Sequence, residues 1–158
     1  MKVFISHQKA DTELAASISH RLRTVHQIDS YLDVIDPVAQ QAGDELGEHI
    51  RAELGRCTQL LAVVSSSTKS SWWVPWEIGI ATEKDQPIAT YAGESTPLPE
   101  YLKKWPYLRS NKDLDEYAAV SKSSSGTYRV RKGYLNEEVA RRSSTAEFHK
   151  TLRARLGQ

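Results

Sequence analysis

Apolar residues along this chain form short continuous runs and longer segments in which apolar positions recur every three or four residues. Continuous runs of this length predict strands that are covered on both faces of a sheet. The clearest runs are KVFIS at 2–6, QLLAVVS at 59–65 and QPIATYA at 86–92, with weaker candidates in IDSYLDV at 28–34 and near WPYLRS at 105–110.

The segments between these runs predict helices. Asp11 precedes the first helix as an N-cap, and a Trp-rich segment opens another that extends to about Glu83. The other helices are expected over 46–57, over 111–120 with Asn111 as a cap, and over SSTAEFHKTLRARL at 143–156, where Ser144 and Glu147 have capping-box spacing.

Strands that alternate with helices predict an α/β fold, in which a parallel sheet carries helices on both faces. Such sheets bind ligands beyond the carboxyl ends of their strands, at the point where strand order reverses. We call this edge of the sheet the rim. Three segments are expected to meet there: Ser6–His7, Asp33 to Gly43, and Ser65 to Ser71.

The length of 158 residues suits one domain with a single core. The longest apolar run, near residues 60–64, is far too short to span a bilayer, and the MKVFISH start shows no secretory leader. Cys57 is the only cysteine, which excludes an internal disulfide and a multi-cysteine zinc site. We therefore expect a cytoplasmic protein without a membrane segment.

Charge is unevenly spread along the chain. Residues 1–120 hold 12 Lys and Arg against 17 Asp and Glu, a net charge of −5, whereas residues 121–158 hold 9 against 3, a net charge of +6. The basic tail could dock on the acidic body or contact nucleic acid, but no basic groove interleaved with aromatic residues supports the second reading. SKSSSGT at 121–127 is expected to be a flexible break.

Several familiar chemistries lack their motifs. No GxGxxG follows the first strand and no P-loop sequence is present, so dinucleotide clamping of the Rossmann type and P-loop nucleotide hydrolysis are unsupported. The five histidines form no HExxH or Cys/His cluster, so we expect no metal site. No GxSxG elbow accompanies a triad.

The segment SSWWVPWEIGI at 70–80 carries the strongest chemical signal. With Ser71 as a cap and Pro75 in the first turn, Trp73 and Glu77 lie at i and i+4 on one helix face, whereas a second stripe faces the sheet. That stripe consists of Val74, Ile78 and Ala81. The simpler interpretation is a packed indole and a solvent-facing carboxylate.

An indole beside a carboxylate suits a ligand in which a flat cationic ring is attached to a sugar. Cleavage of the nicotinamide–ribose bond of NAD⁺ has this requirement, because its transition state resembles an oxocarbenium ion. Nicotinamide leaves as a neutral molecule, so one carboxylate near the developing cation can suffice. NAD⁺ would be the substrate, and no cofactor is expected.

The order of several motifs resembles the Toll/interleukin-1 receptor (TIR) domain in its bacterial form. These motifs are VFISH with Asp11, YLD at 31–33, the loop that reaches Gly43 and ELGEHI, CTQLLAVVSSSTKSSWWVPWEIGIA from residue 57, and LPEYLKKWPYLRS from residue 98. The resemblance covers about residues 1–120. It leaves 121–158 as a basic C-terminal extension, expected to pack as a helix on or beside the domain.

The resemblance implies a flavodoxin-like three-layer fold with a five-stranded parallel sheet, and an enzyme that cleaves NAD⁺. It assigns Glu77 as the catalytic glutamate and Trp73 as its aromatic partner, with Ser6 and His7 beside the nicotinamide ribose. His7 could equally be a polar residue under the loop. Asp33 would begin a loop, roughly 34–45, that covers the site and mediates assembly.

The resemblance also implies self-association through TIR–TIR contacts, as a homo-oligomer or filament, and a separate sensor or effector protein. For a bacterial protein it points to antiphage defence through an ADP-ribose-derived messenger. The alternative is a non-enzymatic TIR adaptor, or a virulence mimic, that binds other TIR domains. Pro75 and the extra indoles of Trp72 and Trp76 depart from the family pattern. Trp72 could contact a neighbouring subunit or belong to the core or a surface patch.

Overall fold

The computed structural model describes residues 1–32, 45–66, 68, 71–93 and 97–158. Its centre is one sheet of five parallel strands in the order β2-β1-β3-β4-β5. The strands are β1 (Lys2–Ser6), β2 (Asp29–Tyr31), β3 (Gln59–Val63), β4 (Ile88–Tyr91) and β5 (Tyr107–Leu108).

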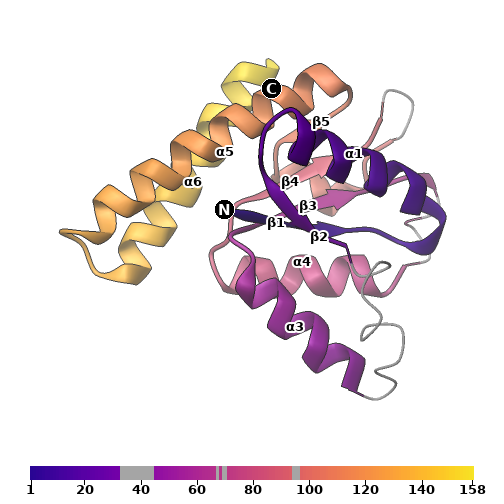
Figure 1. Cartoon of the computed structure of the whole chain (residues 1–158), viewed down its shortest axis with the longest axis horizontal. Helices are drawn as coiled ribbons and strands as arrows, with labels where there is room; N and C mark the ends of the chain where they lie inside the picture. Colours follow the sequence, from indigo (N-terminus) through magenta and orange to yellow (C-terminus); the bar gives the residue numbers. More distant parts are fainter. Residues whose placement is uncertain (33–44, 67, 69–70, 94–96) are drawn as a thin grey trace.

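Helices cover both faces of this sheet, so that the fold has three layers (Figure 1). α1, α5 and α6 pack on one face, whereas α3, α4 and η5 pack on the other. The helices are α1 (Thr12–Thr24), α3 (Leu46–Arg56), α4 (Trp73–Glu83), α5 (Asn111–Lys132) and α6 (Glu137–Leu156), with short 3₁₀ turns η1 (Lys9–Asp11) and η5 (Glu100–Lys104).

The strand pattern explains these two cores. Side chains alternate between the two faces of a strand, so each buried strand contributes to both layers. In β1, Val3 and Ile5 pack with α1 and α5, whereas Phe4 packs with α3 and α4. By the same alternation Ser6 points to the α4 side, which decides what it meets at the rim.

The α/β fold and the five-stranded parallel sheet predicted from the sequence are confirmed. Each predicted run contains a strand, and the helices predicted at 46–57 and up to Glu83 are present as α3 and α4. No helix among the described residues is long and apolar enough to cross a membrane.

The flexible break predicted at 121–127 is wrong, because α5 continues through it to Lys132. Serine has a modest helix propensity, but packing outweighs that preference here. Ser121 is buried, and its hydroxyl donates to Gln59 Oε1 at 3.1 Å. α6 then returns antiparallel to α5, and the two helices lie side by side as a hairpin (Figure 1). The domain boundary proposed at residue 120 stays a prediction, and α5 runs across it without interruption.

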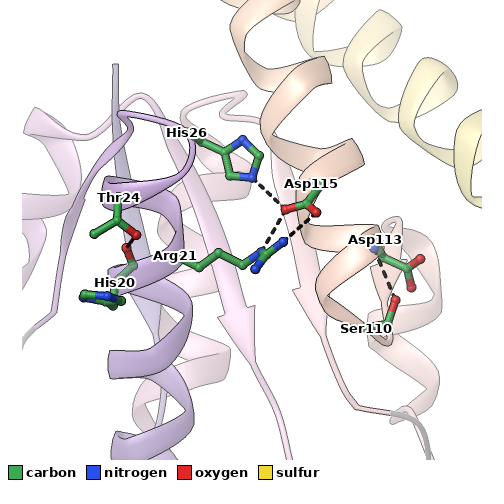
Figure 2. Close-up of polar contacts among 7 residues, drawn as sticks. All are labelled: His20, Arg21, Thr24, His26, Ser110, Asp113 and Asp115. Carbon is green, nitrogen blue, oxygen red and sulfur yellow. Dashed lines mark hydrogen bonds and ion pairs between the residues drawn. The ribbon is translucent and has the colours of Figure 1, made fainter.

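The capping box predicted at Ser144 is also wrong. α6 begins seven residues earlier, at Glu137, where the Asn136 side chain accepts the backbone N–H of Val139 at 2.9 Å. Ser144 instead lies inside α6, is buried, and accepts a hydrogen bond from Arg131 at 3.4 Å. Similarly, Asn111 is not the cap of α5, because Ser110 holds that position and accepts the Asp113 N–H (Figure 2).

An ion pair joins α1 to α5, two helices that pack on the same face of the sheet (Figure 2). Arg21 donates two hydrogen bonds to the Asp115 carboxylate, at 2.9 and 2.7 Å, and His26 Nε2 lies 2.7 Å from the same carboxylate. The Arg21 guanidinium holds the pKa of Asp115 at about 2, well below its usual range. This bidentate pair joins two helices that are far apart in sequence.

α6 is anchored to the sheet by a histidine. The backbone N–H of Ile88, at the start of β4, donates to His149 Nε2 at 3.1 Å. Burial lowers the pKa of His149 to about 4, because it penalises the charged imidazolium. The neutral imidazole is also the form whose Nε2 can accept this bond. The backbone carbonyls of the last two residues of η5, Lys103 and Lys104, each accept a hydrogen bond from the Arg153 guanidinium at 2.8 Å.

The His149 contact predicts a pH dependence of stability. Unfolded His149 has a pKa near 6.5 and takes up a proton before the folded form does, so the contribution is complete above pH 6.5 and is lost as pH falls towards 4. We expect the free energy of unfolding to fall by about 3 kcal/mol over this window from His149 alone.

The measurement is urea unfolding, followed by circular dichroism, of the wild type and His149→Gln across that window. A glutamine amide oxygen can accept the same N–H but does not titrate, so the variant should lose this part of the pH dependence. Identical pH dependence in both proteins would show that His149 is not the titrating anchor. Asp115, with a pKa of about 2, contributes at lower pH and does not confuse the comparison.

Candidate functional site

The rim of the sheet forms where β1 lies between β2 and β3, the point at which strand order reverses. β1 ends at Ser6, which pairs in register with Ala62 of β3. Ser6 and the following residue, His7, are buried at 1% and 4% exposure. The first strand therefore delivers two polar side chains into the protein at the position where this fold class binds ligands.

α4 begins beside this rim, and its local sequence explains how it does so. The N-cap position of α4 is Trp72, one residue after the predicted cap, but the Ser71 hydroxyl still accepts the Val74 N–H at 3.3 Å. Pro75 is the third residue of α4, where its missing N–H removes no intrahelical bond. Val74, Ile78 and Ala81 are buried against the sheet, which fixes the rotation of the helix and turns Glu77 inward.

Glu77 is buried, with 2% of its surface exposed. The Ser6 hydroxyl donates a hydrogen bond to Glu77 Oε2, so the end of β1 and the second turn of α4 are joined directly. A buried carboxylate is costly unless donors satisfy it. The solvent-facing carboxylate of the simpler sequence interpretation is therefore wrong for this structure.

His7 directly follows Ser6, at the end of β1. Its Nδ1 is 3.2 Å from the carbonyl oxygen of Ile5. A carbonyl can only accept, so Nδ1 carries the proton in this contact. His7 is thus held in a fixed orientation at the rim.

Two tryptophans of α4 form an aromatic wall, defined here as Trp73 and Trp76. Their ring centroids are 5.4 Å apart with an interplanar angle of 83°, an edge-to-face contact. Trp73 is 44% exposed and Trp76 is 39% exposed. Because Trp73 and Glu77 are four residues apart on one helix, the half-exposed indole neighbours the buried carboxylate.

In the sequence, Trp76 is only a departure from the family pattern. In the structure, it lies close to the start of α3. Two ring carbons of Trp76 lie 3.9 Å from where a Cβ on Gly47 would stand, in the first turn of α3. The aromatic wall therefore reaches from α4 to α3. No local pattern in the sequence signals this proximity. Trp72 points away from this packing and is 89% exposed.

Asp11 also differs from its predicted role. It occupies the N-cap position of α1, but its side chain makes no capping hydrogen bond. It is 6% exposed, and its Oδ2 has no hydrogen-bond partner among the described residues. Sequence patterns place a carboxylate before a helix as a cap, and only the packed structure reveals that this one turns inward.

Asp33 and most of the loop predicted at 34–45 fall outside the described residues, so the structure leaves their predicted role at the site untouched. Within the described part of the chain, no group of three or more His, Cys, Asp or Glu side chains is arranged to hold a metal ion.

The arrangement brings Ser6, His7, Trp73 and Glu77 to one edge of the sheet. It supplies one carboxylate held by a hydroxyl, and a flat aromatic surface open to ligands. Such a set can stack on a planar ring and stabilise positive charge beside it.

Comparison with known proteins shows which family the chain matches. A family model described as a TIR domain matches residues 3–122, which is 120 of the 158 residues. The match includes β1 from Val3 onward and the other four strands, together with Ser6, Trp73 and Glu77. No curated protein matches the chain.

The Ser6–Glu77 contact predicts a stability change. Ser6→Ala removes the hydroxyl donor and leaves a buried carboxylate oxygen with one donor fewer, so the free energy of unfolding should fall by about 1–3 kcal/mol. Ser17→Ala, at an exposed position of α1, serves as the matched control and should change stability by less than about 0.5 kcal/mol. Chemical denaturation measures both. Equal effects of the two substitutions would show that the contact does not hold β1 to α4.

Proposed function

Because this chain belongs to the family of TIR domains, we propose that it cleaves the nicotinamide–ribose bond of NAD⁺ at the rim. The single observation that carries the proposal is the buried carboxylate of Glu77 beside the half-exposed indole of Trp73. The TIR family includes members that cleave NAD⁺. Four of the residues that the resemblance assigns to the site lie at one edge of the sheet: Ser6, His7, Trp73 and Glu77.

In the proposed reaction, the bond between C1′ of the ribose and the nicotinamide nitrogen breaks, and its electron pair leaves with nicotinamide. The ring leaves as a neutral molecule, so no general acid is needed. The ribose becomes positively charged in the transition state, and the Glu77 carboxylate stabilises that charge at close range. Trp73 stacks on the cationic pyridinium ring before cleavage.

Ser6 is a positioning residue in this scheme. Its hydroxyl holds one oxygen of Glu77, which limits the rotation of the carboxylate and aims the other oxygen. His7, oriented by the Ile5 carbonyl, lies at the same rim and would border the nicotinamide ribose, as the resemblance implies. Asp33 would begin the loop that covers the site.

Access to Glu77 imposes a condition on activity. Only 2% of the residue is exposed, so substrate reaches the carboxylate after neighbouring groups move. TIR domains commonly interact with other TIR domains, and self-assembly into an oligomer or filament would supply that movement. The isolated chain would then be a resting form whose activity rises with concentration or with a partner sensor.

The acceptor of the ribosyl cation decides the product. Water gives ADP-ribose with loss of one proton, whereas attack by an adenine nitrogen or a ribose hydroxyl of the same molecule gives a cyclic product. A closed, dry site favours the second outcome. In bacterial antiphage immunity such a product would act as a signalling nucleotide for a separate effector in the cytoplasm.

One observation favours a second candidate function. Trp72 is 89% exposed, and an indole this open is typical of a protein contact surface. A non-enzymatic adaptor, or a virulence mimic, that binds other TIR domains would use such a surface. An adaptor has no need of a carboxylate buried at the rim, which makes catalysis the better-supported function.

The first test substitutes the carboxylate. Glu77→Gln keeps the size and the hydrogen bond from Ser6 but removes the negative charge, so we expect kcat for nicotinamide release to fall at least about 10²–10³-fold. Chromatography of NAD⁺ incubations at high protein concentration measures this. Glu83→Gln, an exposed carboxylate on the same helix, is the matched control and should keep full activity. Full turnover by a folded Glu77→Gln protein would reject the assignment.

The second test separates binding from chemistry. Trp73→Ala removes the stacking surface, so KM for NAD⁺ should rise about tenfold while kcat changes less. Trp72→Ala removes an indole that lies outside the wall and should leave KM unchanged. If Trp73→Ala unfolds the protein, thermal denaturation will show it, and the indole is then a packing residue. An unchanged KM in a folded variant would remove Trp73 from the site.

A further inference from the structure

A cavity of about 340 Å³ lies at the opposite end of the sheet from the rim, where β1, β3 and β4 begin. One wall comes from the strand starts, through Met1, Gln59 and Pro87, and the other from the α5–α6 hairpin. Its volume falls within the range of small-molecule sites. Neither Ser6 nor Glu77 contributes to it, so the inference does not depend on the proposed function.

The lining of this cavity has one sign of charge. Arg56, Arg129 and Arg141 line it, and no Asp or Glu is among its lining residues in the described part of the chain. Arg56 pairs with Glu53, outside the lining, but Arg129 makes no hydrogen bond or ion pair with any described residue. An arginine without a partner beside a cavity is available to bind an anion.

Two contacts orient the Arg141 side chain. Its guanidinium lies 5.8 Å from the centre of the Tyr128 ring and donates to Glu137 at 3.0 Å. Tyr128 itself lines the cavity, on α5, and faces Arg141 on α6. α5 therefore contributes an aromatic ring to the cavity wall, and α6 contributes a planar cation beside it.

The floor of the cavity contains donors that are poorly matched. Gln59 is buried, and its Oε1 accepts the Ser121 hydroxyl, which fixes the orientation of the amide. The amide nitrogen of Gln59 and the Ser125 hydroxyl both lie 3.3 Å from the thioether sulfur of Met1. A thioether is a weak acceptor, so two good donors converge on a point that an oxygen atom would fill better.

The only cysteine also lines this cavity. Burial raises the pKa of the Cys57 thiol to about 11, so the group is neutral and does not repel an anion. Serine hydroxyls from both helices complete the lining, at Ser124, Ser125 and Ser144.

We infer that this cavity binds a small molecule that bears a phosphate group and is about the size of a mononucleotide. The arginines Arg129 and Arg141 bind the phosphate oxygens, and Gln59 and Ser125 donate to the ligand oxygen that replaces the Met1 sulfur. Arginine forks match phosphate geometry, and the cavity is too small for a dinucleotide to be enclosed. The competing explanation is a solvated basic surface without a ligand.

The experiment is isothermal titration calorimetry of the full chain with three probes: AMP, inorganic phosphate and adenosine. We expect AMP to bind, phosphate to bind more weakly, and adenosine not to bind. Arg129→Gln should weaken AMP binding about tenfold, since it removes a charge-assisted contact. Arg142→Gln is the matched control, because Arg142 is exposed on α6 and does not line the cavity, and it should leave the affinity unchanged.

Two further measurements keep AMP binding at the rim from being mistaken for binding here. Trp73→Ala should leave AMP affinity unchanged, and bound AMP should slow the alkylation of Cys57 by a small thiol reagent. Absence of AMP binding at millimolar concentration would overturn the inference. Equal weakening by Arg129→Gln and Arg142→Gln would also overturn it, because it would show general attraction to a basic surface.

Discussion

The hydrogen bond from Ser6 to Glu77 is the contact on which the account of this molecule depends. It exists because side chains alternate along β1, so that Phe4 fills the core under α4 and Ser6, two residues on, faces the same helix at the rim. The buried stripe of Val74 and Ile78 fixes the rotation of α4 from the other side. A carboxylate that would otherwise be solvated is thereby held inside the protein, with an indole beside it.

Much of this arrangement could be predicted from the sequence, and the exceptions have physical causes. Buried parallel strands leave continuous apolar runs, so the sheet and its rim were accessible to pattern analysis. The serine-rich stretch of α5 was misread because local propensity favours a break there, whereas packing against α6 and the bond from Ser121 to Gln59 favour a helix. The burial of the Asp11 side chain and the closeness of Trp76 to α3 at Gly47 depend on how distant elements pack, which no local pattern records.

The two ends of the sheet have different chemistry, and the topology explains why. At the carboxyl end, loops and the start of α4 bring together a carboxylate, hydroxyl and imidazole with an aromatic wall. At the amino end, the α5–α6 hairpin covers the strand starts and contributes arginines and serines to a cavity. Part of the basic tail therefore lines a cavity. Two of its arginines, Arg129 and Arg141, line this cavity.

A crystal structure of the protein with an unreactive NAD⁺ analogue, in which a carbon atom replaces the ribose ring oxygen, tests the central claim most directly. We expect the nicotinamide ring to lie against the Trp73 indole and a Glu77 oxygen to lie within hydrogen-bond distance of the ribose. The claim would be contradicted by an analogue bound away from the rim while Glu77 stays buried beneath Ser6.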